Sequence, residues 1–219
     1  MMKQDETTII KIPLLGVPHL QIAALNVEHI NIKSWLCGGS TLLSTYRKNH
    51  ALKYYHEADQ QRCIGASLLL DHFLRSYGLR EAAMEYGVNK HGKPYFLHHP
   101  ELHFNLSHSG KFAVAALADH PIGVDIEKLT PFDPEAAAFC MKKSEIKALQ
   151  SHPKEAHDFL FTTSWCLKEA IVKAKGTGIE DEFPIVQLKQ GIPHWEEDPT
   201  SNLSYRIFRL EDYVGAIVF

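Results

Sequence analysis

Two acidic residues in the run IGVDIE have the type and spacing expected of metal ligands. Asp125 and Glu127 are two residues apart in this run, which predicts a strand over 122–127, so both side chains point to one face of it. Two carboxylates on an otherwise apolar strand repel each other, and a divalent cation is the simplest group that neutralises them. Oxygen ligands favour Mg²⁺ or Mn²⁺ over zinc. The ordinary alternative for this pair is a solvated strand face.

A third acidic residue and a lysine lie on one side of a helix that the sequence pattern predicts over 157–175. Leu167 and Ile171 mark its buried stripe, and Glu169 and Lys173 lie well around from that stripe. Alone, they form an exposed i,i+4 ion pair that contributes about 0.2–0.5 kcal/mol. Together with the two strand acids they suit a different task. Three carboxylates would hold a metal ion that keeps positions for water and phosphate oxygens, and the lysine would contact the same phosphates.

Side chains that suit an anion site are scattered through the first half of the sequence. Arginine supplies a fork for phosphate, lysine a point charge, serine a hydroxyl donor, and histidine a donor on either ring nitrogen. Singly, each has a simpler interpretation as a solvated surface group. Gathered around the acids, they would form an anion pocket that one magnesium ion completes. They are Arg47, Lys48, Lys53, Arg62, Lys93, Ser107 and His108.

A run of histidines from 98 to 108 raises the question of a zinc site. His99 and His103 have the i,i+4 spacing of ligands on one helix face, but Pro100 and the strand-like stretch ELHFNL argue against a helix there. No cysteine is near them in the sequence. The pattern therefore favours hard, oxygen-ligated metal chemistry over zinc.

The remaining pattern predicts one α+β unit with a loose organisation in two halves. Apolar residues recur at helical spacing over 59–77 and 157–175, where Gly78 and Gly176 are placed to end the helices. We further expect a strand over 20–27, a helix over 40–50, a short strand within 89–105, a hairpin of 111–118 with 122–127, helices that begin at 133–135 and near Ser144, and strands over 186–195 and 203–219.

Composition and charge exclude several classes of protein. The chain has 219 residues, of which 45% are apolar and 22% charged, as in ordinary globular proteins. Its 23 basic and 26 acidic residues give a net charge of −3, which argues against a general nucleic-acid or membrane binder. The four cysteines are scattered and suit free thiols in a reducing cytosol. The first residues lack the pattern of a secretory signal, and the longest apolar run, 112–118, is too short to span a bilayer. We expect a cytoplasmic protein.

Four stretches of the sequence, read in order, resemble the 4′-phosphopantetheinyl transferases of the type that activates surfactin synthetase. The last of them contains the pattern W-x-x-K-E-A-x-x-K, and 44 residues separate Asp125 from Glu169, as in that family. Together they cover roughly residues 45–180. The stretches are YYHEADQQRCIGASLLL (54–70), GKPYF (92–96) with FNLSHSGKFAVAAL (104–117), PIGVDIEK (121–128) and SWCLKEAIVKAKGTGI (164–179).

The resemblance implies a fold and an activity. Larger members of the family are pseudo-dimers of two similar α+β halves with the active site between them, which here would be 1–121 on the nucleotide side and 122–219 on the metal and pyrophosphate side. The implied reaction is attack of a serine hydroxyl of an apo acyl, peptidyl or aryl carrier protein on the β-phosphate of coenzyme A, with release of 3′,5′-ADP. The resemblance also implies a monomer, and it does not distinguish fatty-acid, polyketide and nonribosomal-peptide carriers.

Roles for individual residues follow from the same resemblance. Asp125, Glu127 and Glu169 would be the magnesium ligands, and Lys173 would contact the pyrophosphate. Glu169 is the first candidate for the base that takes the serine proton, and a metal-bound water is the second. The other residues that the resemblance places near coenzyme A are Lys93, Asn105, Ser107, His108, Arg62 and Arg47.

Three further residues lie in or near these motifs. His50 stands where relatives more often carry Lys or Arg against the 3′-phosphate, so that contact would depend on pH. Lys168 belongs to the family motif but receives no role. Trp165 is expected to pack beside the site.

Two other functions use the same residues. A magnesium-dependent phosphohydrolase acting on a nucleotide would need the same acids and cations, with water as the nucleophile. A non-catalytic module that binds coenzyme A or a carrier protein would explain the phosphate-facing residues, but not three acids that converge on a metal. Incubation with coenzyme A, magnesium and an apo carrier separates them, because only a transferase modifies the carrier.

Overall fold

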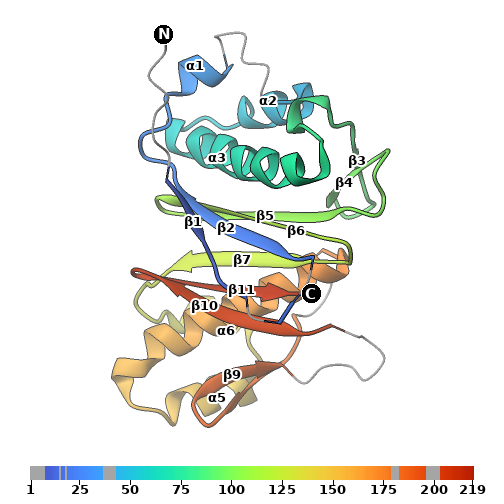
Figure 1. Ribbon diagram of the computed structural model, residues 1–219. Coiled ribbons are helices and arrows are strands. Elements are labelled where there is room, and N and C mark those ends of the chain that lie inside the picture. Colours follow the sequence, from blue (N-terminus) through green and yellow to red (C-terminus); the bar gives the residue numbers. More distant parts are fainter. Residues whose placement is uncertain (1–7, 15, 18, 37–42, 179–182, 196–202) are drawn as a thin grey trace. The chain divides into compact units, whose positions relative to one another are not determined.

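The structure is a computed structural model that describes residues 8–14, 16–17, 19–36, 43–178, 183–195 and 203–219. The chain divides into two compact units, Met1–His120 and Pro121–Phe219. Each unit contains both helices and antiparallel sheet (Figure 1), which confirms the α+β class. The similarity of two halves and the roles assigned to 1–121 and 122–219 stay predictions.

The first unit is built around an antiparallel sheet with the strand order β1-β2-β6-β5. Its central strand β6 is buried along its whole length, as its apolar sequence FAVAALA predicts. The strand predicted over 20–27 is β2. The elements of the sheet are β1 (Ile9–Lys11), β2 (Gln21–Asn26), β5 (His103–Ser109) and β6 (Phe112–Ala118).

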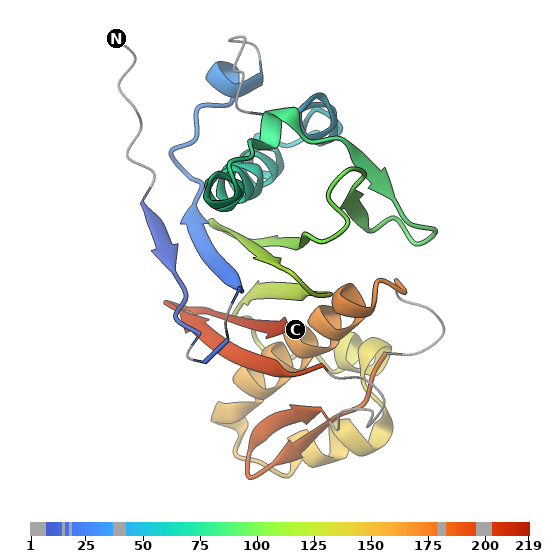
Figure 2. The same cartoon turned by 45° about the vertical axis from the view of Figure 1, so that its right-hand side comes forward.

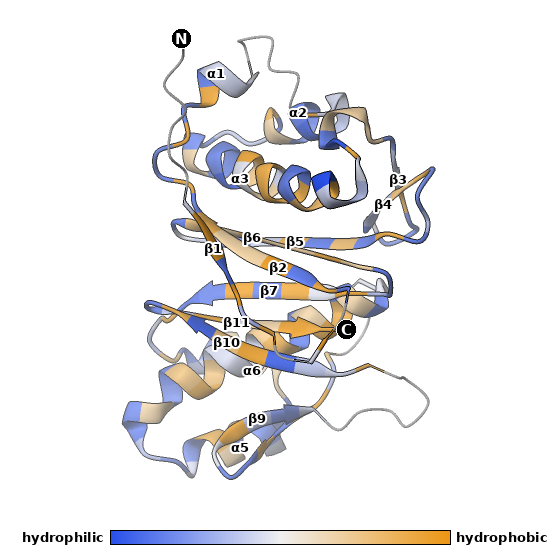
Figure 3. Cartoon of the chain, viewed as in Figure 1, coloured by the Kyte–Doolittle hydropathy of each residue, from blue (hydrophilic) through white to orange (hydrophobic). Residues whose placement is uncertain are grey.

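The long helix α3 (Glu57–Leu74) packs on this sheet (Figures 1 and 2). Its buried residues include Ile64, Leu69 and Phe73, which join residues of β2 and β6 in one hydrophobic core. In Figure 3, hydrophobic colours run along α3 and along β2 beneath it. A 3₁₀ turn, η1 (Arg75–Tyr77), continues α3 as far as Gly78. The helix predicted over 59–77 is therefore confirmed.

Shorter elements complete the first unit. The predicted helix over 40–50 is present as α2, although residues 40–42 lie outside the described part of the chain. Ser44 caps it by accepting a hydrogen bond from Arg47 N. The elements are α1 (Ile32–Leu36), α2 (Thr45–Ala51), η2 (Glu81–Ala83), β3 (Tyr86–Val88) and β4 (Pro94–Phe96), of which β3 and β4 form a separate hairpin.

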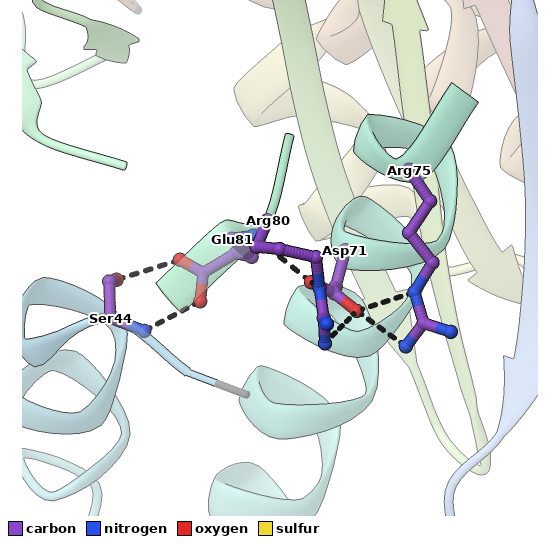
Figure 4. Close-up of polar contacts among 5 residues, drawn as sticks. All are labelled: Ser44, Asp71, Arg75, Arg80 and Glu81. Carbon is purple, nitrogen blue, oxygen red and sulfur yellow. Dashed lines mark hydrogen bonds and ion pairs between the residues drawn. The ribbon is translucent and has the colours of Figure 1, made fainter. Parts of the chain in front are cut away.

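Buried carboxylates tie these short elements to α3 (Figure 4). Glu81 accepts hydrogen bonds from Ser44 N and Ser44 Oγ, both at 2.7 Å. Asp71 on α3 accepts from the guanidinium groups of Arg75 and Arg80 and, at 3.0 Å, from Glu81 N. We call Ser44, Asp71, Arg75, Arg80 and Glu81 the Asp71 cluster. It fixes the start of α2 and the chain after η1 against α3.

The predicted hairpin of 111–118 with 122–127 is wrong. Strand β6 pairs with β5 on one side and with β2 on the other. The hairpin that β6 does form is with β5, and its tight turn is at Gly110. The strand over 122–127 belongs to the sheet of the second unit. Two adjacent apolar runs resemble a hairpin in sequence. A strand that is paired along both edges, however, already has its backbone hydrogen bonds satisfied, so it cannot pair with a third strand.

The second unit is built around an antiparallel sheet with the order β10-β11-β7. The strands predicted over 186–195 and 203–219 are confirmed as two hairpins, β8 with β9 and β10 with β11. The strands are β7 (Gly123–Lys128), β8 (Val186–Lys189), β9 (Ile192–Trp195), β10 (Tyr205–Leu210) and β11 (Tyr213–Val218).

The longest helix of this unit covers one face of the sheet, and two shorter helices precede it in the chain. The predicted start at 133–135 is confirmed, because Asp133 caps α4 by accepting a hydrogen bond from Glu135 N at 2.9 Å. The predicted helix near Ser144 is α5, and the predicted helix over 157–175 is part of a longer one, α6. The helices are α4 (Pro134–Cys140), α5 (Lys143–Gln150) and α6 (Lys154–Lys175).

Helix α6 lies against β7 and β11 (Figure 1) at close range. A Cβ atom added at Gly123 of β7 would lie 2.0 Å from the carbonyl oxygen of Ala170, so only glycine permits this approach. The helix ends at Gly176, whose φ of 67° is the left-handed conformation that glycine adopts without strain. Both glycines thus fix where α6 lies on the sheet.

In the described part of the chain, none of the helices combines the length and apolar character that crossing a bilayer requires.

Candidate functional site

The packing of α6 on β7 brings together three of the residues singled out in the sequence. Side chains alternate along a strand, so Asp125 points to the same face of β7 as Gly123, which is the face that α6 covers. Glu169 and Lys173 are one helical turn apart on α6. The ammonium of Lys173 lies 2.6 Å from Asp125 Oδ1 and 3.8 Å from Glu169 Oε2. We call these three residues the Asp125 cluster.

The Asp125 cluster is buried at one end and open at the other. The side chain of Asp125 is 4% exposed, that of Glu169 15% and that of Lys173 28%. The sequence pattern placed Glu169 well around from the buried stripe of α6, whereas the structure makes it largely buried. Because solvent reaches Lys173, an anionic ligand can also reach it.

The electrostatics of the cluster follow from this mixture of burial and charge. Burial raises the pKa of Glu169, the charge of Lys173 lowers it, and the charge of Asp125 raises it. Overall, this pKa lies above its usual value. For Lys173, burial acts to lower the pKa, but the Asp125 carboxylate and then Glu169 raise it above the usual value. Lys173 is therefore a stable cation held by two acids.

Glu127 lies two residues along β7 from Asp125, on the face towards α6. It is half-buried, and its residue is paired with Val214 of β11. Cys166 of α6 lies near both acids, because the charges of Asp125 and Glu127 add to the burial that raises the pKa of its thiol. The strand prediction, with both carboxylates on one face, agrees with this geometry.

The donor set of these carboxylates suits a hard divalent cation. Every candidate ligand atom of Asp125, Glu127 and Glu169 is a carboxylate oxygen, as Mg²⁺ prefers. Within the residues that the structure describes, however, no three acidic, histidine or cysteine side chains are grouped closely enough to hold one metal ion. In this structure the cation between Asp125 and Glu169 is the ammonium of Lys173. The chemistry of the donor set fits magnesium, and the three-ligand arrangement stays a prediction.

The structure gives Arg47 an interior position in the first unit. Its side chain is buried, and its guanidinium donates to Ser67 Oγ at 2.8 Å and to the carbonyl oxygen of Cys63 at 3.3 Å. These contacts join α2 to α3. A phosphate could reach this arginine only after rearrangement of its surroundings.

Arg62 lies at the turn between β5 and β6. Its guanidinium donates to the carbonyl oxygen of Gly110 at 3.0 Å and forms an ion pair with Asp59. The charge of His108 also acts on Asp59, so the histidine is near this pair. The structure thus brings Arg62 and His108 together at one end of β5.

The other two predicted residues of β5 face the opposite way. Phe104 and Leu106 pack into the core beneath α3, so the alternation of the strand puts Asn105 and Ser107 on the other face of the sheet. Both are buried, with 8% and 7% of their surface exposed. The motif FNLSHS therefore distributes its polar side chains over two faces.

Lys93 lies near the other end of β5. Its charge lowers the pKa of His103, the first residue of that strand, after the larger effect of burial. Burial also lowers the pKa of Lys93 to about 8. A strand of this length spans about 20 Å, so the cations Lys93 and Arg62 lie far apart along β5.

His50, the departure from the family pattern, lies on α2 between Tyr46 and Tyr54. Burial lowers its pKa below the usual value of 6.5, and the charges of Arg47 and Lys53 add to this effect. His50 is therefore uncharged at neutral pH. The pH-dependent contact of His50 with the 3′-phosphate stays a prediction.

One residue that the sequence left without a role has a well-defined position. The side chain of Lys168 is fully buried and lies 2.7 Å from the carboxylate of Glu145 on α5. No local pattern in the sequence pairs two residues that are 23 positions apart. Trp165 packs against Phe183, and its expected place beside the site stays a prediction.

A sequence-family comparison matches the second unit. Residues 121–218 match the model of the 4′-phosphopantetheinyl transferase superfamily. This segment contains β7 and α6, and so the Asp125 cluster and Glu127.

Individual proteins are similar over a longer stretch. A Bacillus subtilis protein named 4′-phosphopantetheinyl transferase is 35% identical over 148 residues, which cover 65% of this chain and 66% of that protein. The 4′-phosphopantetheinyl transferase Sfp of Bacillus subtilis strain 168 is 30% identical over 149 residues, which cover 66% of each chain. The 4′-phosphopantetheinyl transferase psf-1 of Bacillus pumilus is 35% identical over 122 residues, or 55% of this chain and 52% of that protein. The matched segments thus span slightly less than two thirds of the first two relatives' length.

Proposed function

Because this chain belongs to the 4′-phosphopantetheinyl transferase superfamily, we propose that it transfers the phosphopantetheine arm of coenzyme A to a serine of an apo carrier protein. The observation that carries the proposal is the convergence of Asp125 and Glu169 on the ammonium of Lys173. A partly exposed lysine that contacts two acids suits the binding of a diphosphate, which such a transfer needs.

The proposed reaction is a phosphoryl transfer. The serine oxygen of the carrier forms a bond to the β-phosphorus of coenzyme A, and the bond from this phosphorus to the bridging diphosphate oxygen breaks. The leaving group is 3′,5′-ADP, and the serine proton passes to a base, for which Glu169 is the first candidate. Lys173 holds the diphosphate while negative charge grows on the leaving oxygens, which is where a fixed cation lowers the barrier most.

Magnesium is part of the proposal, with manganese as its substitute. Asp125, Glu127 and Glu169 would hold the ion, which supplies positive charge to the diphosphate oxygens when it is bound. The support is the donor set, three carboxylates on β7 and the helix that covers it. Removal of divalent cations with a chelator should stop the reaction, and addition of magnesium should restore it.

We assign the nucleotide of coenzyme A to the first unit and the diphosphate to the second. Lys93, Arg62 and His108 are the candidates for charged and polar contacts with the nucleotide and its phosphates. Asn105 and Ser107 would act from the other face of β5, and the buried position of Arg47 makes it the weakest candidate for a direct contact.

The proposal also covers the setting of the reaction. We expect a monomer in the cytoplasm, where free thiols persist; the described cysteines, Cys63, Cys140 and Cys166, form no disulfides. The partners would be acyl, peptidyl or aryl carrier proteins of fatty-acid, polyketide or nonribosomal-peptide synthesis.

The experiment that tests the proposal is a panel of apo carriers. Each carrier is incubated with the protein, coenzyme A and magnesium, and its intact mass is measured. A carrier that gains one phosphopantetheine group supports the proposal. Consumption of coenzyme A without a modified carrier would indicate a hydrolase, and binding of coenzyme A without either product would indicate a binding module.

A further inference from the structure

Helix α6 carries an ion pair that is fully removed from solvent. The side chain of Lys168 is 0% exposed and that of Glu145 is 3% exposed, and Lys168 Nζ lies 2.7 Å from Glu145 Oε1. The same ammonium donates to the carbonyl oxygen of Pro184, just before β8. Two charges in such a place are costly to desolvate, so the pair persists only because each side is well hydrogen-bonded.

The carboxylate of Glu145 has further partners in the backbone. Its Oε1 accepts from Val186 N at 2.8 Å, at the start of β8, and its Oε2 accepts from Lys142 N at 2.7 Å, where α5 begins. Glu145 and Lys168 thus connect α5, α6 and the entry to β8 through one buried group of hydrogen bonds.

The position of Lys168 on α6 determines what this connection controls. Successive residues on a helix point about 100° apart, so Lys168 points towards Glu145 while Glu169 points towards Asp125. A rotation of α6 about its axis would move both contacts at once. Holding Lys168 in place therefore also holds Glu169 and, one turn later, Lys173.

The burial of Lys168 also argues against a direct contact with substrate. Its ammonium has protein acceptors in Glu145 and Pro184, and none of its side chain is exposed. Lys173, by contrast, is 28% exposed. The two lysines of the W-x-x-K-E-A-x-x-K motif therefore have different surroundings.

We propose that Lys168 is a positioning residue for the transfer reaction, whose buried pair with Glu145 sets the rotation of α6 and so keeps Glu169 and Lys173 beside Asp125. This inference rests on the proposed function, because the reaction is what the alignment serves. A displacement of reacting groups by about 1 Å can cost about a hundredfold in rate.

The test is a double-mutant cycle. Lys168→Met keeps the length of the side chain and removes its charge, and Glu145→Gln removes the opposite charge but keeps an oxygen that accepts hydrogen bonds. Each single change leaves one buried charge without its partner, which is strongly destabilising, whereas removal of both charges is often nearly neutral. Lys154→Met, at an exposed position near the start of the same helix, is the control.

We expect both single variants to lose about tenfold to a hundredfold in kcat, with the KM for coenzyme A within about twofold of wild type. The double variant should regain most of the lost kcat, and Lys154→Met should match wild type. Thermal unfolding, followed by circular dichroism, should show the same order, with the double variant melting above either single variant.

Other results would overturn the inference. If Lys168 contacts coenzyme A, Lys168→Met raises KM by about tenfold or more, and the double variant stays as impaired as Lys168→Met. A folded Lys168→Met with wild-type kcat also refutes the positioning role. If the single variants do not fold, the double variant decides: wild-type-like kcat supports the inference, and a folded but inactive double variant refutes it. A wild-type chain that modifies no carrier refutes the proposed function and the positioning role together, whereas an active wild type with an unaffected Lys168→Met refutes only the latter.

Discussion

The two units each contain a cluster of buried carboxylates, and the clusters differ in how their charge is balanced. In the Asp71 cluster, two arginines and backbone or hydroxyl donors surround Asp71 and Glu81 (Figure 4). In the Asp125 cluster, one lysine serves Asp125 and Glu169, and Glu127 adds a third acid along the same strand face. The first arrangement suits a fixed structural crosslink, because its own side chains neutralise it. In the second, solvent reaches the lysine that binds the acids, which suits contact with a charged ligand.

The contrast between the two clusters would be wrong if the acids of the Asp125 cluster were not needed for transfer. If the proposed function is right, Asp125→Ala or Glu169→Gln should lower the transfer rate by about a thousandfold or more, because the diphosphate would lose the proposed metal and its alignment. The fold should remain intact in both variants. The measurement is the mass of the carrier after a timed reaction, together with thermal unfolding of each variant.

The matched control for these variants is Asp212→Ala. Asp212 belongs to the same unit but forms an exposed pair with Lys128, at 3.4 Å and with 54% of its side chain exposed. Exposed pairs contribute little, so this variant should transfer at the wild-type rate. Wild-type rates in Asp125→Ala or Glu169→Gln would refute the metal assignment.

A second test changes the close approach of α6 to Gly123 of β7, on which the Asp125 cluster depends. In Gly123→Ala, the added methyl group meets the backbone of Ala170 and of Ala174. Overpacking of this kind costs about 1–3 kcal/mol in stability, and we expect a lower kcat from the displaced helix. Denaturant unfolding and transfer kinetics measure the two effects. Unchanged stability would mean that α6 lies farther from β7 than described.

The Asp71 cluster should affect stability and not transfer. Asp71→Asn keeps the shape of the side chain and removes the charge that binds both arginines, so it should lower the free energy of unfolding by about 1–3 kcal/mol. Since the arginines are about half-exposed, we expect the lower part of this range. The kcat of the folded protein should stay within about twofold of wild type. A large loss of kcat at normal stability would contradict the structural assignment.

The same variant has a pH signature. Burial acts to raise the pKa of Asp71, but hydrogen bonds from Arg80 and Arg75 lower it below the usual 3.8 overall. A carboxyl whose pKa is lowered in the folded state contributes stability above its unfolded pKa and loses it as the pH falls. The stability difference between wild type and Asp71→Asn should therefore shrink as the pH drops below about 4, which denaturant titrations at several pH values would measure.

The smallest expected effect concerns Lys93, whose pKa is lowered by burial. Because its pKa is about 8, it loses its charge as the pH rises, and the affinity for coenzyme A should fall by a few-fold between about pH 7 and pH 9. Lys93→Arg, which stays charged over this range, should remove that dependence. Isothermal titration at each pH gives the affinities. An identical pH profile for both proteins would remove Lys93 from the nucleotide contacts.

Much of the local structure was predictable, since periodic apolar residues and glycine ends define α3 and α6. The pairing of strands was not. β6 and the strand after it are adjacent apolar runs, and only the antiparallel ladders with β2 and β5 show that β6 has no free edge. Likewise, strand alternation predicts that Ser107 and His108 face opposite ways. Only the packing of Phe104 and Leu106 into the core beneath α3 shows which face of β5 each of them lies on.

The sequence by itself determined the chemistry of this protein: two acids on one strand face, and an acid and a lysine one turn apart on a helix. It did so because spacing along a strand or helix fixes direction locally. Only the tertiary structure decided that Asp125 meets Lys173, and that Lys168, one residue before Glu169, turns instead to Glu145 in the interior. These contacts join residues far apart in the chain, and they depend on how closely α6 approaches β7, which no local pattern records.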